Sequence, residues 1–235
     1  MMNKMHRGKV TFIYHSGFSV ELNDCSMLFD YWKGNIPIFD NNKPLYVFSS
    51  HAHADHFNPE IFKLRDKYKD IIYILSDDIH ADDAPDIAWV KENSTYQIHG
   101  IDVTTFHSTD EGVAFYVVAK DLRIMHFGDL NWWHWEGESS TFNNEQETAY
   151  KKEIDKMKDL NIDIALGPAL DKRLKPNHWW GIEYFLRNTN ARLVFPMHFF
   201  SKMNTCREVL AMKEMRPYKD RFVSVNEKNQ AFYFD

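Results

Sequence analysis

The strongest constraint on this chain is a cluster of metal-binding side chains in one short segment. Residues 49–57, SSHAHADHF, place three histidines and one aspartate within six consecutive positions. The segment follows the apolar run LYVFSS, which has the composition of a β-strand. A loop at a strand end can bring its side chains together, because the strand anchors the backbone. A solvated polar turn is the competing interpretation. We favour metal binding, because four such residues in six positions are far more than chance gives.

The spacing inside this segment predicts two metal ions. His51 and His53 are two residues apart, so both face the same side of an extended segment. Asp55 and His56 are adjacent and must diverge, which favours one ion for the first pair and a neighbouring ion for the second. Imidazole nitrogen with carboxylate oxygen suits zinc first, with manganese and iron as alternatives.

Three further candidates for metal ligands each come directly after an apolar run. His107 comes directly after IDVTTF. Asp129 follows RIMHF after Gly128, and His198 follows ARLVFP after Met197. A single histidine after a strand is usually a surface residue. Three metal-competent residues in the same position, in a chain that already has a histidine cluster, indicate partners for that cluster.

The pattern of apolar residues predicts an α/β fold. Strands and hairpins fill most of the first half, and helices alternate with strands in the second. With no linker, repeat or low-complexity segment, we expect a single domain over residues 1–235, with two sheets packed between outer helices. Strands or hairpins are expected within residues 9–22, 26–32, 44–50, 71–76, 95–106, 112–127, 162–167, 191–196 and 230–234, and helices within 58–70, 143–160, 181–189 and 204–215.

Composition and net charge limit the cellular compartment and the binding partners that we expect. The net charge of −6 disfavours a broad nucleic-acid surface, which needs excess Lys and Arg. The sequence has no uncharged apolar window long enough to span a membrane, and residues 1–18 lack the apolar core of a signal peptide. Cys25 and Cys206 are expected as free thiols in a reducing compartment. These features together predict a cytoplasmic protein.

The metal-binding segment also carries a family resemblance. Residues 51–56 match the signature H-x-H-x-D-H fully, and His107, Asp129 and His198 follow in the order of the later ligands. The chain therefore resembles the metallo-β-lactamase-fold hydrolases, from HSGFSVE to FPMHF. The resemblance implies an αβ/βα four-layer sandwich of two mixed sheets between outer helices, with a two-metal site at one sheet edge.

The resemblance also implies a role for each matched residue. One ion is assigned to His51, His53 and His107, the other to Asp55, His56 and His198, with Asp129 bridging. A metal-bridging hydroxide would attack the substrate, with Asp55 and Asp129 as catalytic residues. The HSGF opening and the compact length are similar to the small stand-alone group that includes ascorbate-6-phosphate lactonase. GDL in place of the frequent G-D-T, and the stretch GDLNWWHW, depart from the wider superfamily.

Other marked residues leave alternatives open. Trp132, Trp133, His134 and Trp135 form either a substrate wall beside the metals or packing between the sheets. The basic residues in KRLK (172–175) form either an exposed loop, which we favour, or an anion-binding edge. His15 could reach the mouth of the site, and the NHWW segment with His178 could border it, but we favour a strand histidine and a surface histidine, respectively.

The resulting functional hypothesis is a two-metal hydrolase of a small, anionic ester, lactone or phosphoester. The alternative is a nuclease of the same fold, of the tRNA 3′-processing type, which usually has a basic, Gly-rich arm that this sequence lacks. A di-iron redox protein usually carries an acidic residue where this chain has His53. A non-catalytic metal-binding protein is the weakest alternative. We expect a small-molecule substrate and neither a nucleic-acid nor a membrane partner.

Overall fold

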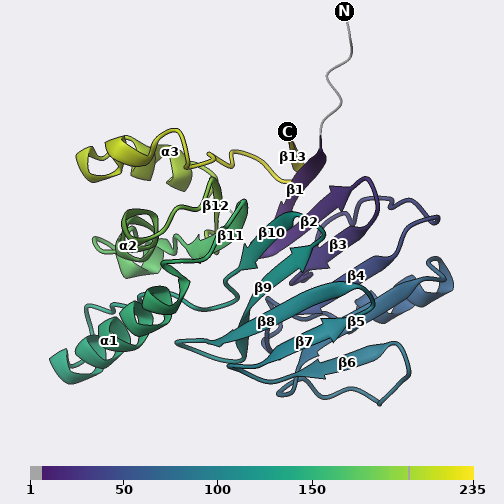
Figure 1. Cartoon of the computed structure of the whole chain (residues 1–235). Coiled ribbons are helices and arrows are strands. Elements are labelled where there is room, and N and C mark those ends of the chain that lie inside the picture. The colour runs from purple at the N-terminus through teal and green to yellow at the C-terminus, as the bar shows by residue number, and fades with distance from the viewer. Residues whose placement is uncertain (1–6, 201) are drawn as a thin grey trace, which may run out of the picture. The chain divides into compact units, whose positions relative to one another are not determined.

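The computed structural model describes residues 7–200 and 202–235, which form two compact units (Figure 1). Unit 1 contains the described residues up to Val90 together with Glu227–Asp235, and unit 2 contains those of Lys91–Asn226. Each unit holds one sheet with both parallel and antiparallel pairs. The predicted α/β class with two mixed sheets is confirmed. The single domain over 1–235 stays a prediction, and part of the expectation about residues 1–18 lies outside the described residues.

Unit 1 is built on long apolar runs that pair side by side. Its three antiparallel pairs join β13 to β1, β1 to β2 and β2 to β3, and parallel pairs continue from β3 to β6. Every residue of β4 and β5 is buried, as expected of parallel strands covered on both faces. The described strands, in sheet order, are β13 (Gln230–Phe234), β1 (Gly8–Tyr14), β2 (Gly17–Leu22), β3 (Ser26–Phe29), β4 (Leu45–Ser49), β5 (Ile71–Ser76) and β6 (Ile87–Val90).

Two features of unit 1 differ from the sequence-based expectation. The helix expected over 58–70 is a 3₁₀ helix, η1 (Pro59–Asp66), and Asn58 begins it by accepting a hydrogen bond from the Glu60 N–H at 3.0 Å. Ile61 is its one buried residue among those described, so little apolar burial supports a longer α-helix. Strand β6 was not predicted, because its short run IAWV is mostly half-buried and ends the sheet.

Unit 2 contains the second sheet and the three described α-helices. Both predicted hairpins are confirmed, and His99 and Gly100 have the positive φ values that a tight β7–β8 turn requires. The strands, in sheet order, are β12 (Leu193–Met197), β11 (Ile164–Ala169), β10 (Leu122–His126), β9 (Val113–Ala119), β8 (Ile101–His107) and β7 (Thr95–Ile98), and the helices are α1 (Ser140–Met157), α2 (Trp180–Asn188) and α3 (Thr205–Leu210).

Helix α3 is shorter than predicted. It ends at Leu210 and is followed by a 3₁₀ helix, η3 (Lys213–Tyr218), and Asn204 makes no side-chain capping bond. Within the described part of the chain, no helix is both long and apolar enough to cross a membrane.

Parallel pairing in unit 2 brings three strand ends to one edge of its sheet. β10, β11 and β12 run in the same direction, and Ala169 pairs with Met197 at the end of the ladder. The Leu170 N–H then donates to the Met197 carbonyl at 2.8 Å. The residues that follow these strands therefore lie at the same edge, which positions Asp129, Asp171 and His198 as neighbours in space.

Candidate metal-binding residues

The histidine segment of unit 1 begins at His51, two residues after β4 ends at Ser49. His51 is fully buried, whereas His53 is exposed. Their side chains nevertheless converge: His51 Nε2 lies 3.1 Å from His53 Nδ1, and the ring centroids are 4.6 Å apart. Two imidazole nitrogens on one side of the loop are the arrangement that a shared ion requires.

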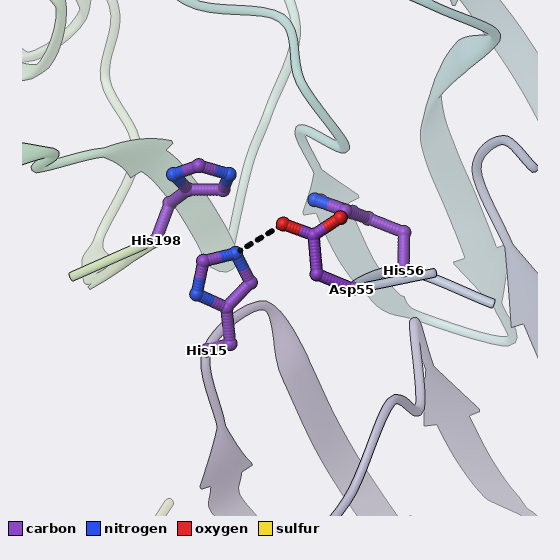
Figure 2. A group of neighbouring side chains, drawn as sticks. All are labelled: His15, Asp55, His56 and His198. Atoms are coloured by element: carbon purple, nitrogen blue, oxygen red, sulfur yellow. Dashed lines mark ion pairs between the residues drawn. The ribbon is translucent and has the colours of Figure 1, made fainter. Parts of the chain in front are cut away.

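A second group in unit 1 gathers around Asp55 (Figure 2). The Asp55 Oδ2 atom lies 3.2 Å from His15 Nε2, and the His15 and His56 rings are 5.7 Å apart. These three residues offer ligand atoms that all lie within 4.8 Å of one another. Unit 1 alone therefore presents a second set of nitrogen and oxygen atoms at metal-binding spacing.

The expectation for His15 was wrong. The residue lies in the turn between β1 and β2 rather than in a strand, with φ of +57°, and it is fully buried against Asp55. A histidine between two apolar strands looks structural in sequence, because periodicity does not show which loop lies beside it. The HSGF motif was the available signal.

A buried carboxylate orients two histidines of unit 1 through their Nδ1 atoms. Asp30, which follows β3, is fully buried and lies 2.7 Å from His56 Nδ1. It also accepts hydrogen bonds from the Ser50 N–H at 2.8 Å and the Ser50 hydroxyl at 2.6 Å. Ser50 Oγ is in turn 2.9 Å from His51 Nδ1. Such contacts at Nδ1 orient a histidine so that its Nε2 can bind a metal. In the sequence, Asp30 is only one aspartate after an apolar run.

In unit 2, Asp129 and His198 come together. His198 Nε2 lies 3.5 Å from Asp129 Oδ1, and both residues are buried. His198 has φ of +61°, a backbone conformation uncommon outside glycine. The Trp133 indole donates to the Asp129 carbonyl at 2.8 Å and packs 5.5 Å from the His198 ring.

His107 contacts a different carboxylate. It ends β8 with its side chain about half exposed, and its Nδ1 contacts the Glu92 carboxylate. Among the described residues, no cluster of three or more metal-competent side chains includes His107. Its role as a ligand stays a prediction, and Glu92 is a partner that the sequence did not indicate.

Asp171 is a further carboxylate that the sequence analysis missed. It is buried, its Oδ2 lies 3.2 Å from His198 Nδ1, and Arg173 Nε donates to the same oxygen at 2.8 Å. Burial alone would raise the pKa of Asp171, but the contacts with His198 and Arg173 outweigh it and lower the pKa to about 2. Asp171 is therefore a carboxylate at neutral pH.

The basic residues near Asp171 already have acidic partners. Arg173 pairs with Asp171, Lys172 lies 2.7 Å from Glu208, and Lys175 lies 3.7 Å from the same oxygen. They are therefore poorly suited to form an anion-binding edge. The expectation for His178 was also wrong, because the residue is buried. Its burial lowers the pKa of His178, and the positive charge of the nearby Lys175 lowers it further.

The tryptophan-rich stretch divides between two neighbourhoods of unit 2. Trp133 is buried beside His198, and Trp135 stacks on it at 6.2 Å. Trp132 and His134 instead lie 5.1 Å and 5.0 Å from Trp180 of α2. Trp133 therefore packs within unit 2, while a substrate wall and packing between the sheets both stay predictions. A pocket of about 360 Å³ beside α2 is lined by Trp132, Glu147, Trp179, Trp180, Glu183 and Arg187.

The donor sets of both units fit a divalent metal. Imidazole nitrogens and carboxylate oxygens are the ligands of zinc and related ions. Several of these donors are already held in place by neighbouring groups, which is typical of metal ligands. The structure thus has potential His/Asp metal sites.

Comparison with known proteins places the fold in a family. The sequence profile of the beta-lactamase superfamily domain matches residues 9–198. The chain belongs to this superfamily. The two mixed sheets and their helices fit its α/β fold, which confirms the family expected from the motif. Among curated proteins, none matches this chain.

Solved structures of similar fold include metal-dependent hydrolases of this superfamily. Igni18, a metallo hydrolase from Ignicoccus hospitalis, has a TM-score of 0.65 at 14% identity, over 97% of this chain and 98% of the other. A protein from Parabacteroides distasonis that is described as a candidate metal-dependent hydrolase has a TM-score of 0.56 at 17% identity over 92% of each chain. The metallo-beta-lactamase fold protein YhfI from Bacillus subtilis has a TM-score of 0.63 at 13% identity, over 97% of this chain and 100% of the other. At these identities the similarity shows the fold.

Proposed function

We propose that this protein is a metal-dependent hydrolase that binds two divalent ions. The observation that carries the proposal is the way both units prepare histidines for a metal: Asp30 lies 2.7 Å from His56 Nδ1, and Asp171 lies 3.2 Å from His198 Nδ1. A surface histidine needs no buried carboxylate behind it. The proposed ligands are His51, His53, Asp55, His56, His107, Asp129 and His198, with zinc as the first candidate and manganese or iron as alternatives.

Each residue contributes differently to hydrolysis. Bound divalent ions would supply Lewis acidity and lower the pKa of a water to be used as nucleophile. Asp129 would be the shared ligand, held by the Trp133 indole through its backbone carbonyl. Asp55 is our candidate for handling the proton, and His15, whose Nε2 lies 3.2 Å from the Asp55 carboxylate, would orient it.

The substrate we favour is a small, anionic ester, lactone or phosphoester. Two divalent ions bring more positive charge than Asp55 and Asp129 bring negative charge, so the metal site itself would attract an anion. The whole chain has a net charge of −6, which gives no broad surface for a polyanion. Lys172, Arg173 and Lys175 are engaged with carboxylates and add little to this attraction.

The test combines metal content with activity. Protein loaded with excess zinc or manganese and then desalted should contain close to two equivalents by elemental analysis. It should hydrolyse at least one member of a panel of phosphorylated or carboxylated lactones, esters, thioesters and phosphodiesters, and chelation should abolish that activity. At most one equivalent at saturation, or hydrolysis that persists after the metal is removed, would refute the proposal.

The nuclease alternative makes a different prediction about salt. Binding of nucleic acid weakens steeply with salt as phosphate contacts multiply, whereas binding of a small anion weakens modestly. We expect negligible cleavage of precursor tRNA by the metal-loaded protein. Efficient cleavage of structured RNA with a steep salt dependence would favour the nuclease.

A further inference from the structure

Asp171 and His198 lie at the ends of neighbouring parallel strands of unit 2. Asp171 comes two residues after β11 and begins the 3₁₀ helix η2 (Lys172–Leu174), and His198 directly follows β12. The Leu170 N–H donates to the Met197 carbonyl at 2.8 Å, which fixes one strand end against the other. The position of Asp171 relative to His198 is therefore set by the sheet itself.

Arg173 holds the Asp171 carboxylate in one orientation. Its backbone N–H donates to Asp171 Oδ1 at 2.9 Å, while its guanidinium donates to Oδ2 from Nε at 2.8 Å and also from Nη2. The guanidinium lies 5.6 Å from the Trp135 ring centroid and 5.0 Å from that of Phe200, within range of cation–π attraction. These contacts leave Oδ2 directed at His198 Nδ1, 3.2 Å away.

Each ring nitrogen of His198 faces a carboxylate, and the closer one lies at Nδ1: Asp171 Oδ2 is 3.2 Å from Nδ1, whereas Asp129 Oδ1 is 3.5 Å from Nε2. Because a carboxylate accepts hydrogen bonds, the closer contact favours the tautomer that carries its proton on Nδ1. In a neutral imidazole, Nε2 then keeps its lone pair, as a metal ligand must. Nε2 is also the atom that lies 3.5 Å from Asp129 Oδ1.

We propose that Asp171, clamped by Arg173, is a positioning residue that fixes the tautomer and ring orientation of His198 and so prepares Nε2 to bind a metal. This inference rests on the proposed function, because it assigns His198 to the metal centre. It also gives a role to Arg173 and Trp135: the arginine orients the aspartate, and the aromatic rings orient the arginine.

The first test reads the tautomer in the metal-free protein and needs no activity. With ¹⁵N-labelled histidine at pH 8, the His198 signals are assigned by their loss in His198→Gln. Wild type should show protonated Nδ1 and unprotonated Nε2, and Asp171→Asn should shift His198 toward the other tautomer. The matched control is Asp163→Asn, because Asp163 precedes the same strand and pairs with Arg192 at 3.2 Å. His198 should keep its wild-type tautomer in that variant.

The second test measures zinc affinity by competition with a chromophoric chelator. Loss of a group that orients a metal-binding histidine typically weakens affinity by about 10–100-fold, which we expect for Asp171→Asn and not for Asp163→Asn. Arg173→Gln keeps the carboxylate but removes the clamp, so an intermediate loss is expected. It becomes the deciding variant if circular dichroism shows that Asp171→Asn does not fold.

The two tests separate this inference from the proposed function. A wild-type protein that binds neither zinc, manganese nor iron would refute the proposed function, while the tautomer measurement would still decide whether Asp171 positions His198. An unchanged tautomer and unchanged zinc affinity in a folded Asp171→Asn variant would overturn the positioning role, even if the enzyme is active.

Discussion

The two units hold their candidate metal ligands in different ways. In unit 1, one carboxylate serves a continuous segment: Asp30 contacts His56 directly and reaches His51 through the Ser50 hydroxyl. In unit 2, Asp171 contacts one histidine and itself depends on Arg173, whose side chain is more than half exposed. The first arrangement is buried and compact, whereas the second reaches the protein surface.

This difference indicates what each unit can tolerate. The Asp30 network has no exposed member that water could replace, so breaking it leaves buried polar groups without partners. Part of the Asp171 network can exchange a lost contact for water, because the Arg173 guanidinium is accessible. Substitutions in unit 1 should therefore reduce stability more, and substitutions in unit 2 should act more selectively on metal binding.

The largest effect should come from the shared ligand of unit 2. Asp129→Ala removes the carboxylate beside His198 Nε2, and we expect hydrolysis to fall to the background rate, with loss of bound metal. Trp133→Ala, the control, removes an indole that contacts the Asp129 backbone and the His198 ring but offers no metal ligand, so it should retain measurable activity and metal. Steady-state kinetics and elemental analysis of both variants are the measurements. Equal loss of activity with full metal retention in both would contradict the assignment.

The next largest effect should be on the stability of unit 1. Asp30→Ala leaves Ser50 and His56 with buried polar atoms that have lost their acceptor, and removal of one member of such a pair costs about 3–5 kcal/mol in the free energy of unfolding. Asp171→Ala should cost less, because Arg173 can turn to solvent. Urea unfolding of the metal-free proteins measures both. A larger loss for Asp171→Ala would reverse the comparison between the units.

The contiguous ligands of unit 1 could be predicted from sequence because they need no tertiary information. The segment 51–56 carries its own spacing, and the apolar run before it identifies a strand end. His15 and Asp30 lie 36 and 21 residues before His51. Only the order of strands β1-β2-β3-β4 in the sheet shows that their loops share a sheet edge. A lone histidine or aspartate after a strand has too many structural explanations to be singled out.

In unit 2 the sequence identified strand ends but not their neighbours. Asp129 and His198 were recognised by position, and the structure places them 3.5 Å apart. Asp171 was missed because ALDKRL resembles an exposed charged loop, and its burial depends on the alignment of β11 with β12. The Trp132–Trp135 stretch shows the same limit, since the direction of each ring depends on the path of a loop.

A smaller effect is expected from the hydroxyl that links Asp30 to His51. Ser50→Ala removes the contacts of Oγ with both residues and should cost about 1–3 kcal/mol, with weaker zinc binding. The adjacent Ser49 is a matched control, because it is equally buried and its Oγ has no hydrogen-bond partner among the described residues. Ser49→Ala should leave stability and zinc affinity nearly unchanged. Equal effects of the two substitutions would show that burial, rather than the link to His51, explains the loss.

The smallest effect is expected for alkylation of the buried Cys206 thiol in unit 2. Burial raises the pKa of Cys206 to about 12, so very little of it is thiolate at pH 8, and its side chain is fully buried in α3. Iodoacetamide should therefore modify Cys206 far more slowly in the native protein than in urea, as followed by peptide mass spectrometry. Helix α3 is only six residues long and its first residue has no side-chain cap, so local opening is the route by which Cys206 would react. Alkylation in the native protein at the rate of the unfolded chain would show that this helix opens freely, which would make α3 the weakest element of unit 2.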